Sequence, residues 1–254
     1  MKIYLFGQGS IGKIIKTNLW LNSSIKVILL PLRKTAINEY EDLLLSKERK
    51  IIIDLMDPNS LTEDTDKSLI SKAKVIRNKL SIAKNLQHYI YISSASIYRS
   101  SLKKIDENSL LKLKSLSPYE KLKLENEKSL IKKQIPLTIC RVPNIWGIKS
   151  NKRSFFNDLF NKYSKKDKIK YFDNDKYVIS YINVNDLTSL LEIVSSKKIL
   201  GVVNLSTNSF DTRYNLKARV NHEKIEQINN TVGIRLTSIK IDASKYFSET
   251  RIAI

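Results

Sequence analysis

The sequence KIYLFGQGSIG, residues 2–12, carries the strongest signal for the fold. The apolar run over residues 2–6 is typical of a buried strand, and the residues after Gly12 are typical of a helix that extends to about Leu21. Between them stands the pattern Gly-x-Gly-x-x-Gly, which lets a pyrophosphate approach the backbone at the N-terminus of a helix. The alternative is an ordinary strand-to-helix turn. The strand and helix on either side favour a dinucleotide site, and its predicted residues are Gly7, Gly9, Ser10, Ile11 and Gly12.

Strands and helices alternate along the chain as far as Val142. This alternation predicts an α/β fold with a doubly wound parallel sheet covered by helices on both faces. We expect a dinucleotide-binding domain of residues 1–147 plus about 181–207, and a small substrate lobe of about 148–180 and 208–254. The predicted strands are 2–6, 25–30, 51–55, 88–92, 136–142 and 201–205, and the predicted helices are 40–45, 68–86, 118–133, 185–195 and 220–231.

The composition is that of a globular protein, with 42% hydrophobic residues and a formal net charge of +20. Such a charge is compatible with nucleic acid, an anionic membrane surface or an anionic ligand. The excess lysine is spread over every segment, and no arginine stripe with interleaved aromatic residues occurs, so an anionic small substrate or cofactor is favoured over nucleic acid. No apolar run is long enough for a membrane span. The single cysteine, Cys140, allows no intrachain disulfide and suits a reducing cytoplasm, and no metal site is predicted.

Tyr119 and Lys123 carry the clearest chemical signal. The segment Ser117-Pro118-Tyr119-Glu120 predicts a helix start, with serine at the N-cap and glutamate three residues later. Residues four apart on a helix share one face, and an ammonium beside a phenol favours the phenolate, so such a tyrosine can move a proton near neutral pH. A serine from the strand end at residues 93–96 would hold a substrate oxygen. This arrangement suits proton transfer at a carbinol or carbonyl carbon.

Together with the glycine turn, the segments YIYISSASIY (89–98) and SPYEKLK (117–123) give the chain a resemblance to the extended short-chain dehydrogenase/reductases. Within these enzymes it resembles the NAD-dependent epimerase/dehydratase family, which acts on nucleotide sugars. Further similar segments follow in the same order: Asp106-Glu107, CRVPNIWG (140–147), SYINVNDLTSLL (180–191) and GVVNLST (201–207).

The resemblance implies a role for each matching residue. Tyr119 would be the general acid/base, Lys123 would bind the nicotinamide ribose, and Ser94 would hold the substrate oxygen, with Ser93 and Ser96 as alternatives. Pro143 would line the nicotinamide pocket. Asn144 and one of the basic residues Lys149, Lys152 and Arg153 would contact the substrate or its diphosphate, and Arg153 is our choice among the three.

The cofactor is predicted to be NADP or NAD. The second predicted strand is followed by Arg33 and Lys34 rather than by an acid, and these residues would pair with a 2′-phosphate, which favours NADP. Where the family often has a run of small residues after the third strand, this chain has Asp54-Leu55-Met56-Asp57, and the two acids are expected to weaken binding of the cofactor's phosphates.

The resemblance implies NAD(P)-dependent redox chemistry on the sugar of a nucleotide sugar, at C4, by a cytoplasmic enzyme that forms a homodimer. A reductase and an epimerase share the hydride step. The small lobe and the NADP preference favour a reductase of a 4-keto sugar. The alternative is a catalytically degenerate dinucleotide-binding protein that serves as a sensor or scaffold, for which Asp54, Asp57 and Arg99 are the motivation. A nucleic-acid-binding protein is the third hypothesis.

Overall fold

A computed structural model describes residues 2–7, 9–20, 25–32, 39–58, 61, 65–98, 104–111, 113, 116–147, 169–172, 178–206, 210–212, 225–228 and 240–241. The chain forms two compact units. The first comprises Met1–Ser94, Leu116–Arg141 and Thr188–Val203, and the second comprises Ala95–Ser115, Val142–Leu187 and Asn204–Ile254. The predicted division into a core and a lobe stays a prediction, because much of the lobe lies outside the described residues.

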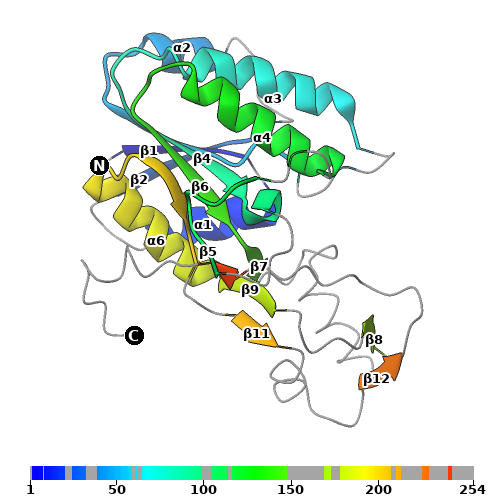
Figure 1. Ribbon diagram of the computed structural model, residues 1–254. Helices are drawn as coiled ribbons and strands as arrows, with labels where there is room; N and C mark the ends of the chain where they lie inside the picture. Colours follow the sequence, from blue (N-terminus) through cyan, green and yellow to red (C-terminus); the bar gives the residue numbers. More distant parts are fainter. Residues whose placement is uncertain are drawn as a thin grey trace. The chain divides into compact units, whose positions relative to one another are not determined.

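The first unit is built on a six-stranded sheet with the strand order β10-β6-β4-β3-β1-β2 (Figure 1). The printed registers of β1 with β2, β1 with β3 and β3 with β4 are all parallel. The strands are β1 (Lys2–Phe6), β2 (Lys26–Leu30), β3 (Lys50–Asp54), β4 (Leu86–Ser94), β6 (Leu137–Val142) and β10 (Gly201–Asn204).

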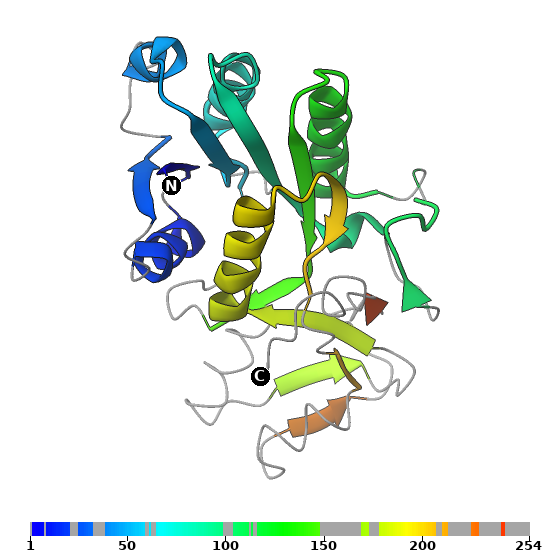
Figure 2. The same ribbon diagram turned by 90° about the vertical axis from the view of Figure 1, so that its left-hand side faces the viewer.

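Helices cover both faces of this sheet. Figure 1 shows α2 (Glu39–Leu45), α3 (Lys67–Leu80) and α4 (Pro118–Ile131) on one face, with α1 (Ser10–Trp20) and α6 (Val184–Lys197) on the other. In Figure 2, α1 lies beside β1 and β2. This arrangement confirms the predicted doubly wound α/β fold.

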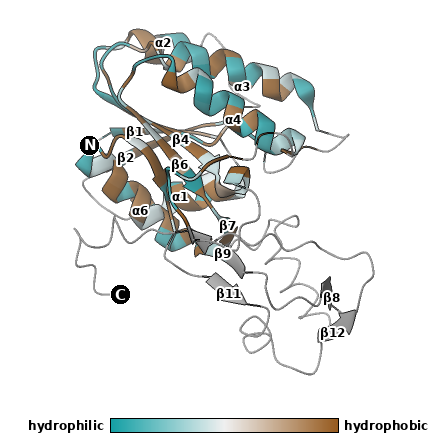
Figure 3. Cartoon of the chain, viewed as in Figure 1, coloured by the Kyte–Doolittle hydropathy of each residue, from teal (hydrophilic) through white to brown (hydrophobic). Residues whose placement is uncertain are grey.

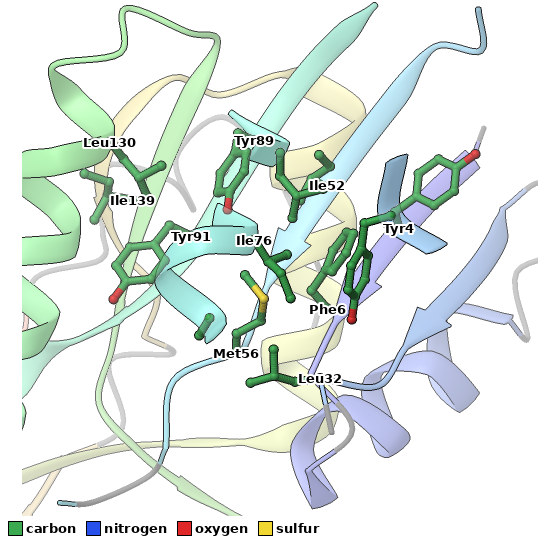
Figure 4. Close-up of a cluster of buried hydrophobic side chains, with 13 residues drawn as sticks. Tyr4, Phe6, Leu32, Ile52, Met56, Ile76, Tyr89, Tyr91, Leu130 and Ile139 are labelled. Carbon is green, nitrogen blue, oxygen red and sulfur yellow. The ribbon is translucent and has the colours of Figure 1, made fainter. Parts of the chain in front are cut away.

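The core follows from the alternation of side chains along the strands. Tyr4 and Phe6 of β1 point to the same face as Ile52 of β3, and Figure 4 shows them packed with Met56 and Ile76 in one cluster. Figure 3 shows that hydrophobic residues concentrate in the strands, whereas α3 and α4 carry many hydrophilic residues. The sheet is therefore held between helices by apolar burial on both faces.

The end of α3 differs from the prediction. The apolar spacing predicted a helix from Ser68 to Leu86, but α3 ends at Leu80 and β4 begins at Leu86. Asn85 adopts φ 55° and turns the chain toward the strand. Ala83 still packs in the core, with 8% of its surface exposed. A buried turn residue thus continued the helical spacing beyond the helix itself.

The second unit contains short strands and the 3₁₀ helix η1 (Ala95–Tyr98). The order of its three-stranded sheet is β11-β9-β7, and β5 and β8 pair with β13 and β12. The predicted helix over residues 220–231 is wrong at β12, because Ile225–Ile228 pairs in parallel with Ile169–Phe172. The strands are β5 (Lys104–Ile105), β7 (Asn144–Trp146), β8 (Ile169–Phe172), β9 (Val178–Asn183), β11 (Phe210–Thr212), β12 (Ile225–Ile228) and β13 (Lys240–Ile241).

Candidate active site

The strand order places a topological switch point between β1 and β3. The chain leaves β1 toward β2 on one side, whereas β3 leads to β4 on the other side. Doubly wound sheets bind their ligands outside the carboxyl ends of the strands at such a point. Here the glycine turn follows β1, and the segment from Leu55 to Pro58 follows β3. The topology therefore points to these two segments as the ligand-binding edge.

Each glycine of the turn has a distinct environment. Gly7 has φ +117°, and a Cβ on it would lie 2.5 Å from the carbonyl oxygen of Leu55. A Cβ on Gly12 would overlap the carbonyl oxygen of Gly7. Gly9, by contrast, is exposed, and none of the residues that the structure describes comes within 4 Å of the position of a Cβ on it. Two glycines are therefore required by packing, while the open space at Gly9 suits the close approach of a ligand to the backbone.

Helix α1 begins within this turn, at Ser10, and includes Gly12. The first N–H groups of a helix have no acceptor within the helix, and the helix dipole places partial positive charge at that end. Ser10 and Ile11 occupy the first two positions, and the N–H of Lys13 bonds the carbonyl of Gly9 at 3.1 Å. This end of the helix has the character of an anion site. Binding of a cofactor by these residues stays a prediction.

A capping box sets the start of α4 and thereby the place of Tyr119. The Glu120 N–H donates to the Ser117 side chain at 3.3 Å, and the Ser117 N–H donates to the Glu120 carboxylate at 2.7 Å. Pro118 is the first helical residue, so the predicted helix start is confirmed. Lys123 follows Tyr119 by one turn, and its Nζ lies 5.8 Å from the centroid of the Tyr119 ring. The tyrosine and the lysine therefore lie together as their spacing predicts.

Lys123 is buried, with 5% of its surface exposed, and its ammonium has two acceptors. Nζ donates to the carbonyl oxygen of Ile92 on β4 at 2.8 Å and to Oδ2 of Asp57 at 3.1 Å. Burial by itself disfavours the charge, but the Asp57 carboxylate and Tyr119 outweigh it and raise the pKa of Lys123. The lysine is therefore held as a cation against the end of β4.

Asp57 and Asp54 lie in a buried ion-pair network with Arg77 of α3. Nη2 of Arg77 lies 2.9 Å from Asp57 Oδ1, and its Nε lies 2.6 Å from Asp54 Oδ2. Burial opposes the charge of Asp57, yet Lys123 and Arg77 lower the pKa of its carboxyl well below the usual range. The two acids expected to weaken phosphate binding are thus each compensated by a cation.

Further polar side chains complete the network. The Tyr89 hydroxyl donates to Asp54 at 2.8 Å, the Tyr91 hydroxyl donates to Asp57 at 2.5 Å, and the Asn126 amide reaches Asp57 at 3.2 Å. Sequence reasoning missed these residues and Arg77. Arg77 follows the apolar position Ile76 and lies four residues after Ala73, so it was a charge on the apolar side of a predicted helix. That signal indicates a buried ion pair.

The serine segment at the end of β4 contains two serines with different environments. Ser93 is buried and donates to Oε1 of Glu127, which is itself paired with Arg141 at 2.8 Å. Ser94, the last residue of β4, is half-buried. The hydroxyl of Ser93 is thus engaged in a buried ion-pair cluster, and the role of Ser94 as the substrate-binding serine stays a prediction. Ser96 lies in the second unit.

The remaining predicted residues lie in the second unit or outside the described residues. Pro143 and Asn144 belong to the second unit, where Asn144 is exposed and its amide donates to the carbonyl of Ser180 at 3.3 Å. Arg33, Lys34 and Arg153 lie outside the described residues. Among the side chains that the structure does describe, no group of three or more His, Cys, Asp or Glu could hold a metal ion, and no helix could cross a membrane.

Comparison with known families decides the class of protein. The model of the NAD dependent epimerase/dehydratase family matches residues 59–206, which include Ser94, Tyr119 and Lys123. This chain belongs to that family. The glycine turn, Asp54 and Asp57 precede the matched segment, so their place in this family member is seen in the structure rather than in the match. No curated protein matches the sequence.

Solved structures share the fold of this family member at low identity. They include UDP-glucuronic acid 4-epimerase from Bacillus cereus in complex with NAD, with 17% identity, 98% of this chain and 92% of that chain covered, and a TM-score of 0.74. A dTDP-4-dehydrorhamnose reductase from Clostridium acetobutylicum has 17% identity, coverages of 99% and 93%, and a TM-score of 0.75. A human epimerase family protein with NADPH has 14% identity, coverages of 98% and 93%, and a TM-score of 0.74.

Proposed function

We propose that this protein is an NAD(P)-dependent enzyme that acts on the sugar of a nucleotide sugar, at C4. The observation that carries the proposal is the arrangement of Tyr119 and Lys123 on α4, with the Lys123 ammonium bonded to the end of β4. The family supports the reaction class. The epimerase and the reductase named above, one of them in complex with NAD, support the substrate class.

The residues of the first unit fit a nicotinamide dinucleotide. The open space at Gly9 leaves room for a pyrophosphate at the start of α1. An ammonium has three donors, and two of those of Lys123 bond Asp57 and Ile92; among the described residues this leaves one donor for a ribose hydroxyl. When bound, the nicotinamide supplies hydride transfer to or from a carbon of the sugar.

The protein's own residues supply the proton transfer and the positioning. Tyr119 takes the proton of the sugar hydroxyl in the oxidative direction and returns it in the reductive direction. Lys123 keeps a positive charge beside the tyrosine, and Ser94 donates a hydrogen bond to the same sugar oxygen. Holding the sugar in this geometry contributes much of the rate.

Among enzymes of this class, we propose a reductase of a 4-keto sugar that uses NADP, with an epimerase and NAD as the alternatives. The basic pair Arg33 and Lys34 supports NADP. The degenerate sensor or scaffold was motivated by the charges of Asp54 and Asp57, and their ion pairs with Arg77 weaken that motivation.

The test begins with nicotinamide fluorescence. Cofactor-stripped protein is titrated with NADPH and NADH, together with Gly9→Val. Because the site of a Cβ on Gly9 is open, the variant is expected to unfold at the wild-type temperature while it loses cofactor binding. A wild type that binds neither nucleotide would overturn the proposal.

The second step tests turnover over a panel of nucleotide sugars, by nicotinamide absorbance and by analysis for epimerised product. Tyr119→Phe is expected to abolish turnover and leave cofactor affinity nearly unchanged, because only the acidic hydroxyl is removed. A Tyr119→Phe variant with wild-type turnover would refute the assignment of the general acid/base. Cofactor binding without redox change or epimerisation on any sugar would favour the sensor or scaffold.

A further inference from the structure

The Lys123 ammonium faces a buried carboxylate on the ligand-binding edge of the sheet. Asp57 lies 3.1 Å from Nζ, and it follows Leu55, whose carbonyl packs against Gly7, by two residues. Side chains of Asp57 and Lys123 are 2% and 7% exposed. Solvent therefore screens this pair little, and the negative charge of the carboxylate also influences the groups that lie beside the ammonium.

Asp57 is also firmly placed. Its carboxylate accepts from Arg77, Tyr91 and Asn126 as well as from Lys123. A carboxylate with four different donor side chains has no acceptor capacity to spare for a rearrangement, so its distance from Lys123 is set by the fold. The same donors hold it ionised in a buried place.

The buried network is electrically balanced. Two carboxylates, Asp54 and Asp57, face two cations, Arg77 and Lys123. Removing one carboxylate leaves an uncompensated positive charge, which is unfavourable in a buried site. The ionisable group that can offset this charge beside Lys123, on its own helix face, is the phenol of Tyr119.

We propose that Asp57 is a positioning residue that acts through Lys123: its carboxylate offsets part of the ammonium's charge and so sets the pH range in which Tyr119 exchanges its proton. The inference rests on the proposed function only for its catalytic consequence. The ionisable groups that face Lys123 or its carboxylate come from the β3 end, α3, β4 and α4, and they are Asp54, Asp57, Arg77, Tyr89, Tyr91 and Tyr119.

Asp54 provides a matched control. It bonds Arg77 and Tyr89 in the same buried network, but its carboxylate bonds neither Lys123 nor Asn126 among the contacts described above. Asp54→Asn and Asp57→Asn each remove one buried carboxylate charge that pairs with Arg77. Only Asp57→Asn removes the charge that faces Lys123. Loss of stability is expected for both, so stability does not separate a structural role from the proposed one.

The decisive measurement is a spectroscopic titration of tyrosine ionisation, by ultraviolet difference absorbance of the full chain. Each protein is compared with its own Tyr119→Phe counterpart, and the difference isolates the ionisation of Tyr119. Because Asp57, unlike Asp54, bonds the ammonium beside the Tyr119 ring, Asp57→Asn is expected to change this difference spectrum at lower pH than the wild type does, and by clearly more than Asp54→Asn. A midpoint that stays constant or rises in Asp57→Asn, or equal shifts in both variants, would overturn the proposal.

A second measurement covers the case in which Asp57→Asn does not fold. An ammonium held in a buried ion pair exchanges its protons slowly, so the side-chain ¹⁵N–H signal of Lys123 is expected to be observable in the wild type and absent from Lys123→Gln. The buried ammonium of Lys50, which has three backbone acceptors, serves as the reference. A Lys123 signal that exchanges as rapidly as surface lysines would refute the ion pair. Neither measurement depends on NADPH binding, so the inference and the proposed function can fail separately.

Discussion

Acidification is expected to destabilise the protein through His88, a histidine of β4 with 0% of its surface exposed. The Thr138 hydroxyl donates its proton to the carbonyl of Ile199, so it accepts from Nε2 of His88, 2.6 Å away. Nδ1 is buried and has no partner among the residues that the structure describes. A second proton would therefore sit at Nδ1 without an acceptor, and burial lowers the pKa of His88 from 6.5 to about 4.

The sign follows from the two states. The imidazole is neutral in the folded protein between about pH 4 and 6.5, whereas the unfolded chain binds a proton in that range, so the free energy of unfolding falls as the pH falls. The pKa difference between 6.5 and about 4, at about 1.4 kcal/mol per unit, corresponds to about 3 kcal/mol. About 2 kcal/mol of this is expected to be lost between pH 7 and pH 5.

Urea unfolding of the wild type and of His88→Gln at pH 7 and pH 5 measures this loss. The glutamine amide can keep the hydrogen bond to Thr138 but does not titrate, so the wild type should lose about 2 kcal/mol more than the variant on acidification. Other titrating groups act on both proteins and cancel in the comparison. Equal losses in the two proteins would exclude His88 as the source of the acid sensitivity.

Two further predictions concern stability. Lys50 is buried, and its ammonium donates to the carbonyls of Ser46, Glu48 and Lys84. Lys50→Met should therefore lower the free energy of unfolding by about 3 kcal/mol, because three acceptors lose their donor. Urea unfolding measures this change, and a loss as small as that of the surface variant Lys79→Met would contradict the prediction. Ser117→Ala should lower the free energy of unfolding by about 1 kcal/mol, because the capping box of α4 is lost. Thermal unfolding compares it with Ser129→Ala on the same helix, and equal melting temperatures of the two variants would exclude the cap as a stabilising element.

The extent of successful prediction follows the range of the interactions. The start of α4 was predicted because its signals, Ser117, Pro118 and Glu120, lie within four residues and act on one another. The end of α3 was not, because the turn at Asn85 is bound to the start of β3 through the Lys50 N–H. The strand at Ile225–Ile228 was read as a helix, since its pairing partner lies more than fifty residues earlier in the chain.

The alternating α/β fold, the glycine turn and the pairing of Tyr119 with Lys123 follow from the amino-acid sequence alone, because apolar periodicity, glycine conformation and helical spacing are local properties. The surroundings of that pair depend on contacts between segments that are distant in the sequence. Asp57, Arg77 and Lys123 come from a strand end and two helices, and their side chains meet only when the parallel register of β3 and β4 and the packing of α3 and α4 bring them together. The acids that looked like an obstacle to the cofactor are therefore partners of cations, because burial in a packed core requires each charge to find its opposite.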